Sequence, residues 1–316
     1  MTGSLPVAAV DLGTNTCLLL VARQEGSLIV PLARELRVVR LGAGLEATGR
    51  LSDAAMNRAV TVLREYHKII SDLGCHKVWC VATAAFRAAA NSSDLQQRIH
   101  QATGFEMNSI NGQREAGLVW RAVRELFPPI AGARVMVDVG GGSTEIIVEQ
   151  AGELADIVSL PLGSVQLTER HLISDPYEAG ELTRLRGDIA RILGTAAKLE
   201  NVESFIGVGG TATTLVAMKL GMQVYDHDRV QGATLDIASL EAILRSCAAL
   251  PLVERKQLPG LHPGRAEVIV AGGLILTAVM ERLGVKVMQV SDHGLRWGMV
   301  LELLAEEAGG SGPSPR

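Results

Sequence analysis

The segment AAVDLGTNTCLLLVAR (Ala8–Arg23) is an apolar run interrupted by an aspartate and a short polar turn. Asp11 closes the first apolar stretch, and the small or turn-forming residues Gly13–Thr16 precede the second. Glycine lets the backbone bend sharply and approach a bound group closely. The pattern therefore predicts two strands joined by a hairpin turn, with the aspartate at the end of the first strand.

A second stretch, MVDVGGGSTEIIV (Met136–Val148), has the same plan. The two copies are offset by 127 residues (138 − 11), which is about one domain length. We therefore expect two half-chains built alike. The matching positions are Asp138, Gly140 and Ser143 over Asp11, Gly13 and Thr16.

The length of 316 residues favours two domains. The longest uncharged apolar run, Val268–Met280, is shorter than the roughly 20 residues that a membrane helix needs. The first residues, MTGSLPVAAVD, have no positively charged segment and reach an acidic residue early. That is not the pattern of a secretory signal, so we expect a cytoplasmic protein.

Composition also limits the partners. The net charge is −4 and aromatic residues make up only 3% of the chain, which argues against a nucleic-acid-binding surface. The cysteines are scattered without metal-ligand spacing and are expected to be small, reduced core residues. They are Cys17, Cys75, Cys80 and Cys247.

Strands and helices alternate along the chain, which is typical of the α/β class. The first 50 residues read as short strands broken by Gly26, Pro31 and Gly42. A helix is predicted from Ser52, a capping residue, to Gly74. A strand at residues 76–83 and further helical sequence to residue 104 follow, and the second half repeats this alternation.

The two turns predict a phosphate-binding site that is built differently from the common glycine-rich motifs. Each is followed by strand-like sequence without a Walker lysine, so neither fits a P-loop or a dinucleotide fold. In a hairpin turn, backbone N–H groups and hydroxyls can surround an anion. The aspartate at each strand end then has a natural role in holding Mg²⁺ against phosphoryl oxygens.

The chain resembles the exopolyphosphatase and guanosine pentaphosphate phosphohydrolase family, within the acetate kinase, sugar kinase, Hsp70 and actin superfamily. The resemblance covers nearly the whole chain. Its landmarks occur in the family's order: DLGTNTCLLLV, RELRVVRLGAGL, VATAAFRAAAN, INGQREAGLVW, VDVGGGSTEIIV, LPLGSVQLTE, GVGGTATTL, PGRAEVIVAGGLIL and VSDHGLRWGMV.

This resemblance implies an α/β fold of two actin-like ATPase (ribonuclease H-like) domains with a cleft between them. We expect the first domain at residues 1–126 and the second at 127–298. A final helix at 299–307 is expected to return to the first domain, and the tail at 309–316 to be disordered.

The resemblance also implies roles for individual residues. Glu115 matches the carboxylate that activates the attacking water, and Arg87 the arginine that grips the phosphate chain. Asp11, Asp138 and Glu145 match metal-binding carboxylates, with Mg²⁺ or another divalent cation as the cofactor. The phosphate loops are Gly13, Thr14, Asn15 and Thr16 in the first copy and Gly140, Gly141, Gly142 and Ser143 in the second.

Several interpretations stay open at this stage. Glu115 alone reads as a first-turn glutamate that stabilises a helix, and only the resemblance favours catalysis. Gly209, Gly210 and Thr211 are expected either to contact a nucleoside or to form a packing turn between strand and helix. Two departures from the family, Arg114 and Trp297, have no assigned consequence.

The expected function is a Mg²⁺-dependent phosphohydrolase that releases terminal phosphate from inorganic polyphosphate or from guanosine pentaphosphate (pppGpp). The expected substrate partner is polyphosphate or guanosine penta- or tetraphosphate. A kinase of the same fold and a nucleotide-binding protein of the actin type are the alternatives. No nucleic-acid or membrane partner is expected. The apolar run near Val268 is expected to lie in the hydrophobic core. A homodimer contact through this run is the less favoured alternative.

Overall fold

The computed structural model describes residues 4–195 and 201–308. Contacts between Cα atoms divide the chain into two compact units. Unit 1 comprises Met1–Asn111 and Leu295–Arg316, and unit 2 comprises Gly112–Gly294. Each unit has its own sheet and its own core.

Unit 1 is built on a five-stranded sheet with the order β3-β2-β1-β4-β5. β1, β4 and β5 are parallel, whereas β1, β2 and β3 form an antiparallel meander. The carboxyl ends of β1 and β4 therefore lie at the same edge, where the Gly13 turn follows β1. The strands are β1 (Val7–Leu12), β2 (Thr16–Glu25), β3 (Leu28–Val38), β4 (Lys77–Ala82) and β5 (Met107–Ser109).

One expectation for this region is wrong: Pro31 does not break a strand. It lies inside the 11-residue β3, opposite Ala22. Proline lacks an N–H, but β3 is the edge strand of the sheet and its pairing with β2 shifts register between Val21 and Ala22. Edge strands and bulges are the positions where a sheet tolerates proline.

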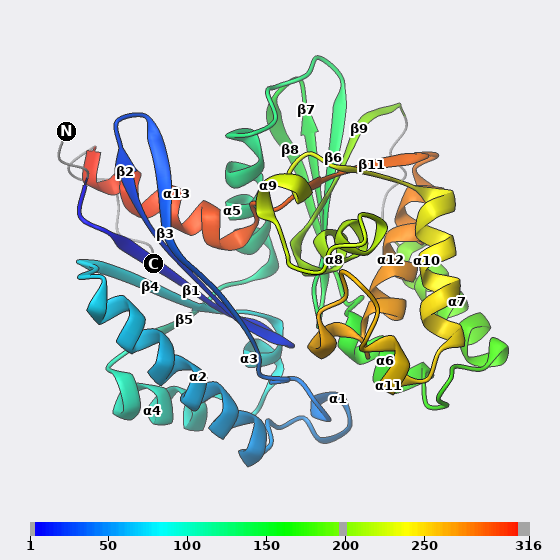
Figure 1. The fold of residues 1–316 in the computed structure, drawn as a ribbon, viewed down its shortest axis with the longest axis horizontal. Helices are drawn as coiled ribbons and strands as arrows, with labels where there is room; N and C mark the ends of the chain where they lie inside the picture. The colour runs from blue at the N-terminus through cyan, green and yellow to red at the C-terminus, as the bar shows by residue number, and fades with distance from the viewer. Residues whose placement is uncertain (1–3, 196–200, 309–316) are drawn as a thin grey trace. The chain divides into compact units, whose positions relative to one another are not determined.

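Helices cover the sheet of unit 1 on both faces (Figure 1). α2 is capped by Ser52, whose hydroxyl accepts from the Ala55 amide, and it packs with β1 and β2 in a buried core. The last helix, α13, packs on β1 and β2, and its Arg296 donates to the Leu19 carbonyl at 2.8 Å. The helices are α1 (Leu45–Thr48), α2 (Asp53–Asp72), α3 (Ala84–Ala88), α4 (Ser92–Thr103) and α13 (Leu295–Ala308).

Unit 2 contains a six-stranded sheet with the order β10-β11-β9-β6-β7-β8. β6, β9 and β11 are parallel, so their carboxyl ends share one edge, and β6, β7 and β8 form a second antiparallel meander. The strands are β6 (Ala133–Val139), β7 (Thr144–Gln150), β8 (Glu153–Leu160), β9 (Val202–Val208), β10 (Thr234–Asp236) and β11 (Val287–Ser291).

Most helices of unit 2 share one large core with the alternate residues Val135, Val137 and Val139 of β6. α5 instead packs on β7 and β8, on the face that carries the intervening β6 residues. The helices are α5 (Gly112–Arg124), α6 (Ser164–His171), α7 (Ala179–Leu193), α8 (Gly209–Lys219), α9 (His227–Val230), α10 (Ile237–Ala249), α11 (Leu252–Arg255), the 3₁₀ helix η1 (Pro263–Arg265) and α12 (Ile269–Arg282).

The sequence analysis expected boundaries after Leu126 and Gly298, whereas the contacts divide the chain after Asn111 and Gly294. The first boundary lies before α5 because this helix packs on strands of unit 2. The expected disordered tail lies outside the described residues. In the described ranges, every helix is too short or too polar to cross a membrane. All four cysteines are free thiols, as expected, and three of them are buried.

Candidate active site

The two predicted turns have the same backbone geometry. In unit 1 the Gly13 amide donates to the Thr16 carbonyl at 2.9 Å, and in unit 2 the Gly140 amide donates to the Ser143 carbonyl at 2.9 Å. Each bond closes a hairpin between antiparallel strands. The sequence prediction of two hairpin turns in matching register is therefore confirmed.

Neighbouring loops use the carbonyl groups of both turns. In unit 1, the Asn15 carbonyl accepts from the amides of Val39 and Arg40 at 3.0 and 2.9 Å, and the Thr14 carbonyl accepts from Gly42 at 2.9 Å. These loop residues belong to the landmark RELRVVRLGAGL, which now has a structural explanation. It fixes the first turn.

The second turn is held by the first residues of α6. The Gly140 carbonyl accepts from the Ser164 amide at 2.9 Å, and the Gly141 carbonyl accepts from Val165 at 3.0 Å. By contrast, the amides of Gly141 and Gly142 donate no hydrogen bond to the part of the chain that the structure describes. With the carbonyls of Gly140 and Gly141 occupied and these two donors available, the turn is suited to an anion.

Asp138 and Glu145 are paired carboxylates. They are directly opposite each other in the register of β6 and β7, so their side chains lie on the same face. Glu145 is 1% exposed, and its Oε1 accepts from the Ser159 hydroxyl at 2.8 Å. Ser159 lies on β8 directly opposite Glu145, so Asp138, Glu145 and Ser159 form a row across three neighbouring strands.

The surroundings of Asp138 are buried and electropositive. Gly209, the first residue of α8, lies so close that a Cβ added there would be 2.9 Å from Asp138 Cγ. The N-terminus of a helix carries partial positive charge. Burial raises the pKa of Asp138 from 3.8 to about 6, and the positive charge of Arg265 opposes this shift.

Arg265 lies beside the second residue of α8. Its guanidinium occupies the space that a side chain at Gly210 would take. Thr211 is 5% exposed, and its hydroxyl donates to the Val139 carbonyl at 2.9 Å. Gly209, Gly210 and Thr211 thus have packing roles next to Asp138, and their role toward a nucleoside stays a prediction.

Glu115 lies in the first turn of α5, and its Oε2 atom is buried. The start of this helix lies over Glu145 and Ser159. A Cβ at Gly112 would be 2.6 Å from Ser159 Cβ and 3.2 Å from Glu145 Oε1. Glu115 therefore lies on a helix whose first residue, Gly112, contacts Glu145 and Ser159.

Arg87 and Asp11 belong to unit 1. Arg87 is in the last turn of the short helix α3, and its guanidinium donates to the Ile110 carbonyl. Asp11 is on β1 opposite Leu18, and one of its carboxylate oxygens is buried. Their roles in binding phosphate and metal stay predictions.

The residues of unit 2 fit a magnesium ion. Carboxylate oxygens are the ligands that Mg²⁺ prefers, and a cation beside Asp138 would offset the cost of burying its charge. Within residues 4–195 and 201–308, no three His, Cys, Asp or Glu side chains gather into a metal site. Two carboxylates with water and phosphate oxygens completing the shell is the usual arrangement for Mg²⁺.

A further polar group lies after β11. The Tyr225 hydroxyl donates to Asp292 Oδ1 at 2.5 Å, and His227 Nδ1 is 2.7 Å from Asp292 Oδ2. The rings of Tyr225 and His227 meet edge to face at 4.9 Å. Asp292 follows a parallel strand at the edge where the Gly140 turn also lies.

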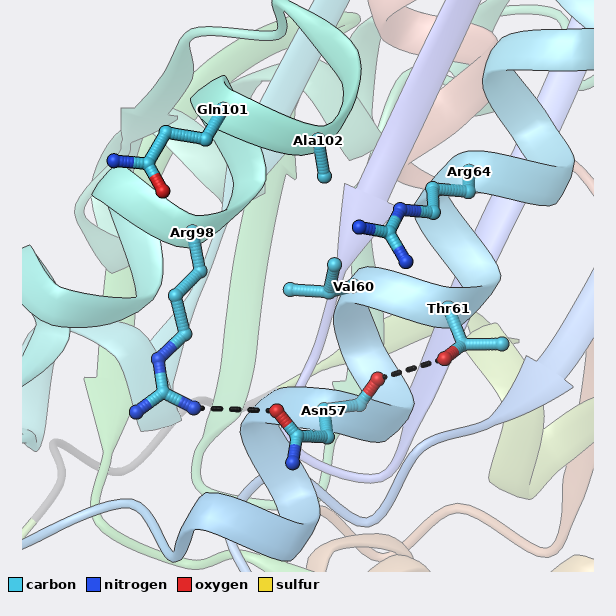
Figure 2. A pocket seen from close by; sticks show the side chains of 7 residues that line it. All are labelled: Asn57, Val60, Thr61, Arg64, Arg98, Gln101 and Ala102. Atoms are coloured by element: carbon cyan, nitrogen blue, oxygen red, sulfur yellow. Dashed lines mark hydrogen bonds between the residues drawn. The ribbon is translucent and has the colours of Figure 1, made fainter.

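A separate cavity of about 350 Å³ lies between α2 and α4 of unit 1. Figure 2 shows that two arginines enter it from different helices, and that Arg98 is hydrogen-bonded to Asn57. The donor–acceptor distance of this bond is 3.2 Å. None of its lining residues is a predicted site residue. They are Asn57, Val60, Thr61, Arg64, Arg98, Gln101 and Ala102.

Comparison with known proteins identifies the family to which these turns belong. A sequence profile of the Ppx/GppA phosphatase family matches residues 20–307. The chain belongs to the Ppx/GppA phosphatase family. The resemblance inferred from the sequence landmarks is therefore confirmed.

Curated relatives of this Ppx/GppA chain match along nearly their full length. It is 34% identical to Exopolyphosphatase 2 of Mycobacterium tuberculosis over 315 residues, covering 94% of this chain and 98% of the relative. It is 28% identical to Exopolyphosphatase 1 of Mycobacterium bovis over 312 residues, covering 96% and 90%.

Solved structures agree with the fold of this Ppx/GppA phosphatase. An exopolyphosphatase-like protein superposes with a TM-score of 0.90 at 29% identity, covering 96% of this chain and 99% of that one. The Aquifex aeolicus family member gives a TM-score of 0.79 at 30% identity, covering 96% and 98%. The expected two-sheet α/β class, with the actin-like ATPase fold of the family, is confirmed.

Sequence reasoning missed four polar residues that the structure places in or near the candidate site: Ser159, Arg265, Tyr225 and Asp292. Two of them lie in quoted landmarks, Arg265 in PGRAEVIVAGGLIL and Asp292 in VSDHGLRWGMV. Their place in these landmarks marks both residues as part of the family resemblance. The local sequence, however, does not indicate which side chains they contact. Tyr225 and Ser159 had no sequence signal at all.

Proposed function

We propose that this protein is an exopolyphosphatase, which hydrolyses the terminal phosphoanhydride bond of inorganic polyphosphate in the cytoplasm. Membership of the Ppx/GppA family and the names of the M. tuberculosis and M. bovis relatives support this substrate. The family also supports pppGpp as the second candidate, since the same terminal phosphate chemistry applies to it. The observation that carries the proposal is the second turn, where two amide donors follow a strand whose Asp138 is paired with the buried Glu145.

In the proposed mechanism, the turns bind the substrate. The amides of Gly141 and Gly142 and the hydroxyl of Ser143 bind phosphoryl oxygens in unit 2. Gly13, Thr14, Asn15 and Thr16, with Arg87 as a planar cation, bind phosphate in unit 1. Because phosphoryl transfer needs mainly positioning and charge neutralisation, these groups supply much of the catalysis.

Within unit 2, Asp138 and Glu145 would hold Mg²⁺, and the metal-binding role of Asp11 in unit 1 stays a separate prediction. The ion supplies charge neutralisation at the phosphoryl oxygens. Glu115 accepts a proton from the attacking water while the water oxygen bonds to the terminal phosphorus. The bond between that phosphorus and the bridging oxygen breaks, and the shortened polyphosphate leaves with its electron pair.

The test is release of inorganic phosphate from short and long polyphosphate, pppGpp and ATP, compared side by side with and without Mg²⁺. Glu115→Gln keeps the shape of the side chain but cannot accept the proton. We expect phosphate release to fall by about 10²- to 10⁴-fold on the preferred substrate. Glu125→Gln, the same change at an exposed position just after α5, is the matched control.

Two results would overturn the proposal. One is the absence of phosphate release from every substrate tested. The other is wild-type activity in Glu115→Gln. Phosphate transfer that depends on an added acceptor would favour the kinase alternative instead.

A further inference from the structure

α5 contacts β7 near both ends of the helix. At its start, Gly112 lies over Glu145 and Ser159. Near its end, Trp120 Nε1 donates to Glu149 Oε2 at 3.0 Å. Glu115, the proposed base, lies between these two contacts.

The spacing of the two contacts matches along helix and strand. Gly112 and Trp120 are eight residues apart, which is about 12 Å of helix. Glu145 and Glu149 are four residues apart, which is about 13 Å of strand, and their even spacing puts both on one face. α5 therefore lies along β7, and its translation is fixed relative to Glu145.

The acceptor for Trp120 is itself held rigidly. Glu149 is 0% exposed and forms an ion pair with Arg134, which is 3% exposed, at 2.9 Å. The same guanidinium donates to the carbonyls of Phe127 and Pro128 at 3.2 and 2.5 Å, in the segment that follows α5. Separating a buried carboxylate from such a partner is strongly destabilising, so Glu149 is held in place.

We infer that Trp120, oriented by Glu149 and Arg134, is a positioning residue that sets the place of the Glu115 carboxylate. This inference rests on the proposed function, in which Glu115 activates the water. The Trp120 bond joins the later part of α5 to a buried residue of β7, so its loss removes a directional contact that helps to fix the rotation of the helix on the sheet. A displacement of about 1 Å is enough to lower the rate of a positioned reaction strongly.

The test is Trp120→Phe, which removes the N–H donor and keeps an aromatic ring. We expect kcat on the preferred substrate to fall about tenfold with KM within twofold of wild type, because turn residues rather than Glu115 bind the phosphate. Arg124→Gln is the control. Arg124 stacks on Trp120 at 4.4 Å, so its loss perturbs the same ring without removing the bond to Glu149.

A double variant separates positioning from general damage. If Trp120 acts through Glu115, then adding Trp120→Phe to Glu115→Gln causes no further loss of kcat. Unchanged kcat in Trp120→Phe, a rise in KM alone, or the same fall in both backgrounds would each overturn the inference. Wild-type activity in Glu115→Gln would instead overturn the proposed function, so the two failures are distinct.

Folding is checked by a single cooperative thermal transition in each variant. Should Trp120→Phe not fold, benzothienylalanine is incorporated at position 120, because it replaces the indole N–H by sulfur at nearly constant shape. The same fall in kcat supports the inference, and wild-type kcat overturns it.

Discussion

Asp138 lies directly opposite Glu145 across the β6–β7 hairpin, with both carboxylates on one face of the sheet. The equivalent position to Glu145 in the first hairpin is Leu18, opposite Asp11. The two hairpins thus share a backbone plan but differ in charge. Only the second presents two carboxylates side by side.

Glu145→Gln is expected to weaken binding of Mg²⁺ at least tenfold, because one of two adjacent anionic ligands becomes neutral. Isothermal titration of the protein with MgCl₂ measures this directly. Glu153→Gln, at an exposed position on β8, is the control and should bind Mg²⁺ as wild type does. Equal affinity in the two variants would contradict the assignment of Glu145.

Asp138→Asn is expected to stabilise the metal-free protein near pH 8. The pKa of Asp138 is about 6 in the folded protein against its ordinary 3.8, so the folded state keeps the proton longer. The carboxyl's contribution to the free energy of unfolding is therefore greatest below pH 4, falls as pH rises to about 6, and then levels off. The total change is at most about 3 kcal/mol.

Urea unfolding in EDTA at pH 4.5 and pH 8 measures this effect. The stability gained by Asp138→Asn should be larger at pH 8 than at pH 4.5, and phosphate release, measured separately with Mg²⁺ at pH 8, should be lost. A gain that is independent of pH would show that the charge of Asp138 is not the cause.

Gly163→Ala is expected to distort the second turn. A Cβ at this position would be 2.6 Å from the Gly142 carbonyl carbon, and backbone cannot move aside as a flexible side chain can. We expect a loss of stability of about 1–3 kcal/mol with a large loss of phosphate release. Thermal unfolding and the phosphate assay test the two effects.

The matched control is Gly187→Ala. Gly187 is exposed in the interior of α7, and a Cβ there meets nothing within 4 Å. Alanine should stabilise this helix by about 1 kcal/mol and leave activity unchanged. If Gly163→Ala behaved like Gly187→Ala, close packing on the turn would not matter.

Arg265→Gln is expected to shift the pH dependence of Mg²⁺ binding upward. The positive charge of Arg265 lowers the pKa of Asp138 against the effect of burial, so its removal raises that pKa further. Since Mg²⁺ binds the deprotonated carboxylate, the acidic limb of the binding curve should move to higher pH. Arg229→Gln, at an exposed position on α9, should leave the curve in place.

Much of the fold followed from local patterns in the sequence. Ser52 predicted the start of α2, and the glycine turns predicted both hairpins, because capping and turn chemistry depend on a few adjacent residues. Pro31 was misread for the same reason. Whether proline breaks a strand depends on its place in the sheet, which the local sequence does not contain.

The site was only partly predictable. The turns and Glu145 were found because they lie within one short segment or matched a family landmark. Ser159 and Arg265 reach the carboxylates of unit 2 through strand pairing and helix packing over long stretches of sequence. The bond of Trp120 to Glu149 likewise joins residues whose partnership no local periodicity indicates.

The return of α13 to unit 1 also fixes an order of events during synthesis on the ribosome. Residues 112–294 make up unit 2, whereas the helix that covers one face of β1 and β2 is complete only when Leu295–Ala308 has been translated. Co-translational folding generally completes the earlier domain first. In this chain the second-made unit can finish folding while the first still waits for its last helix.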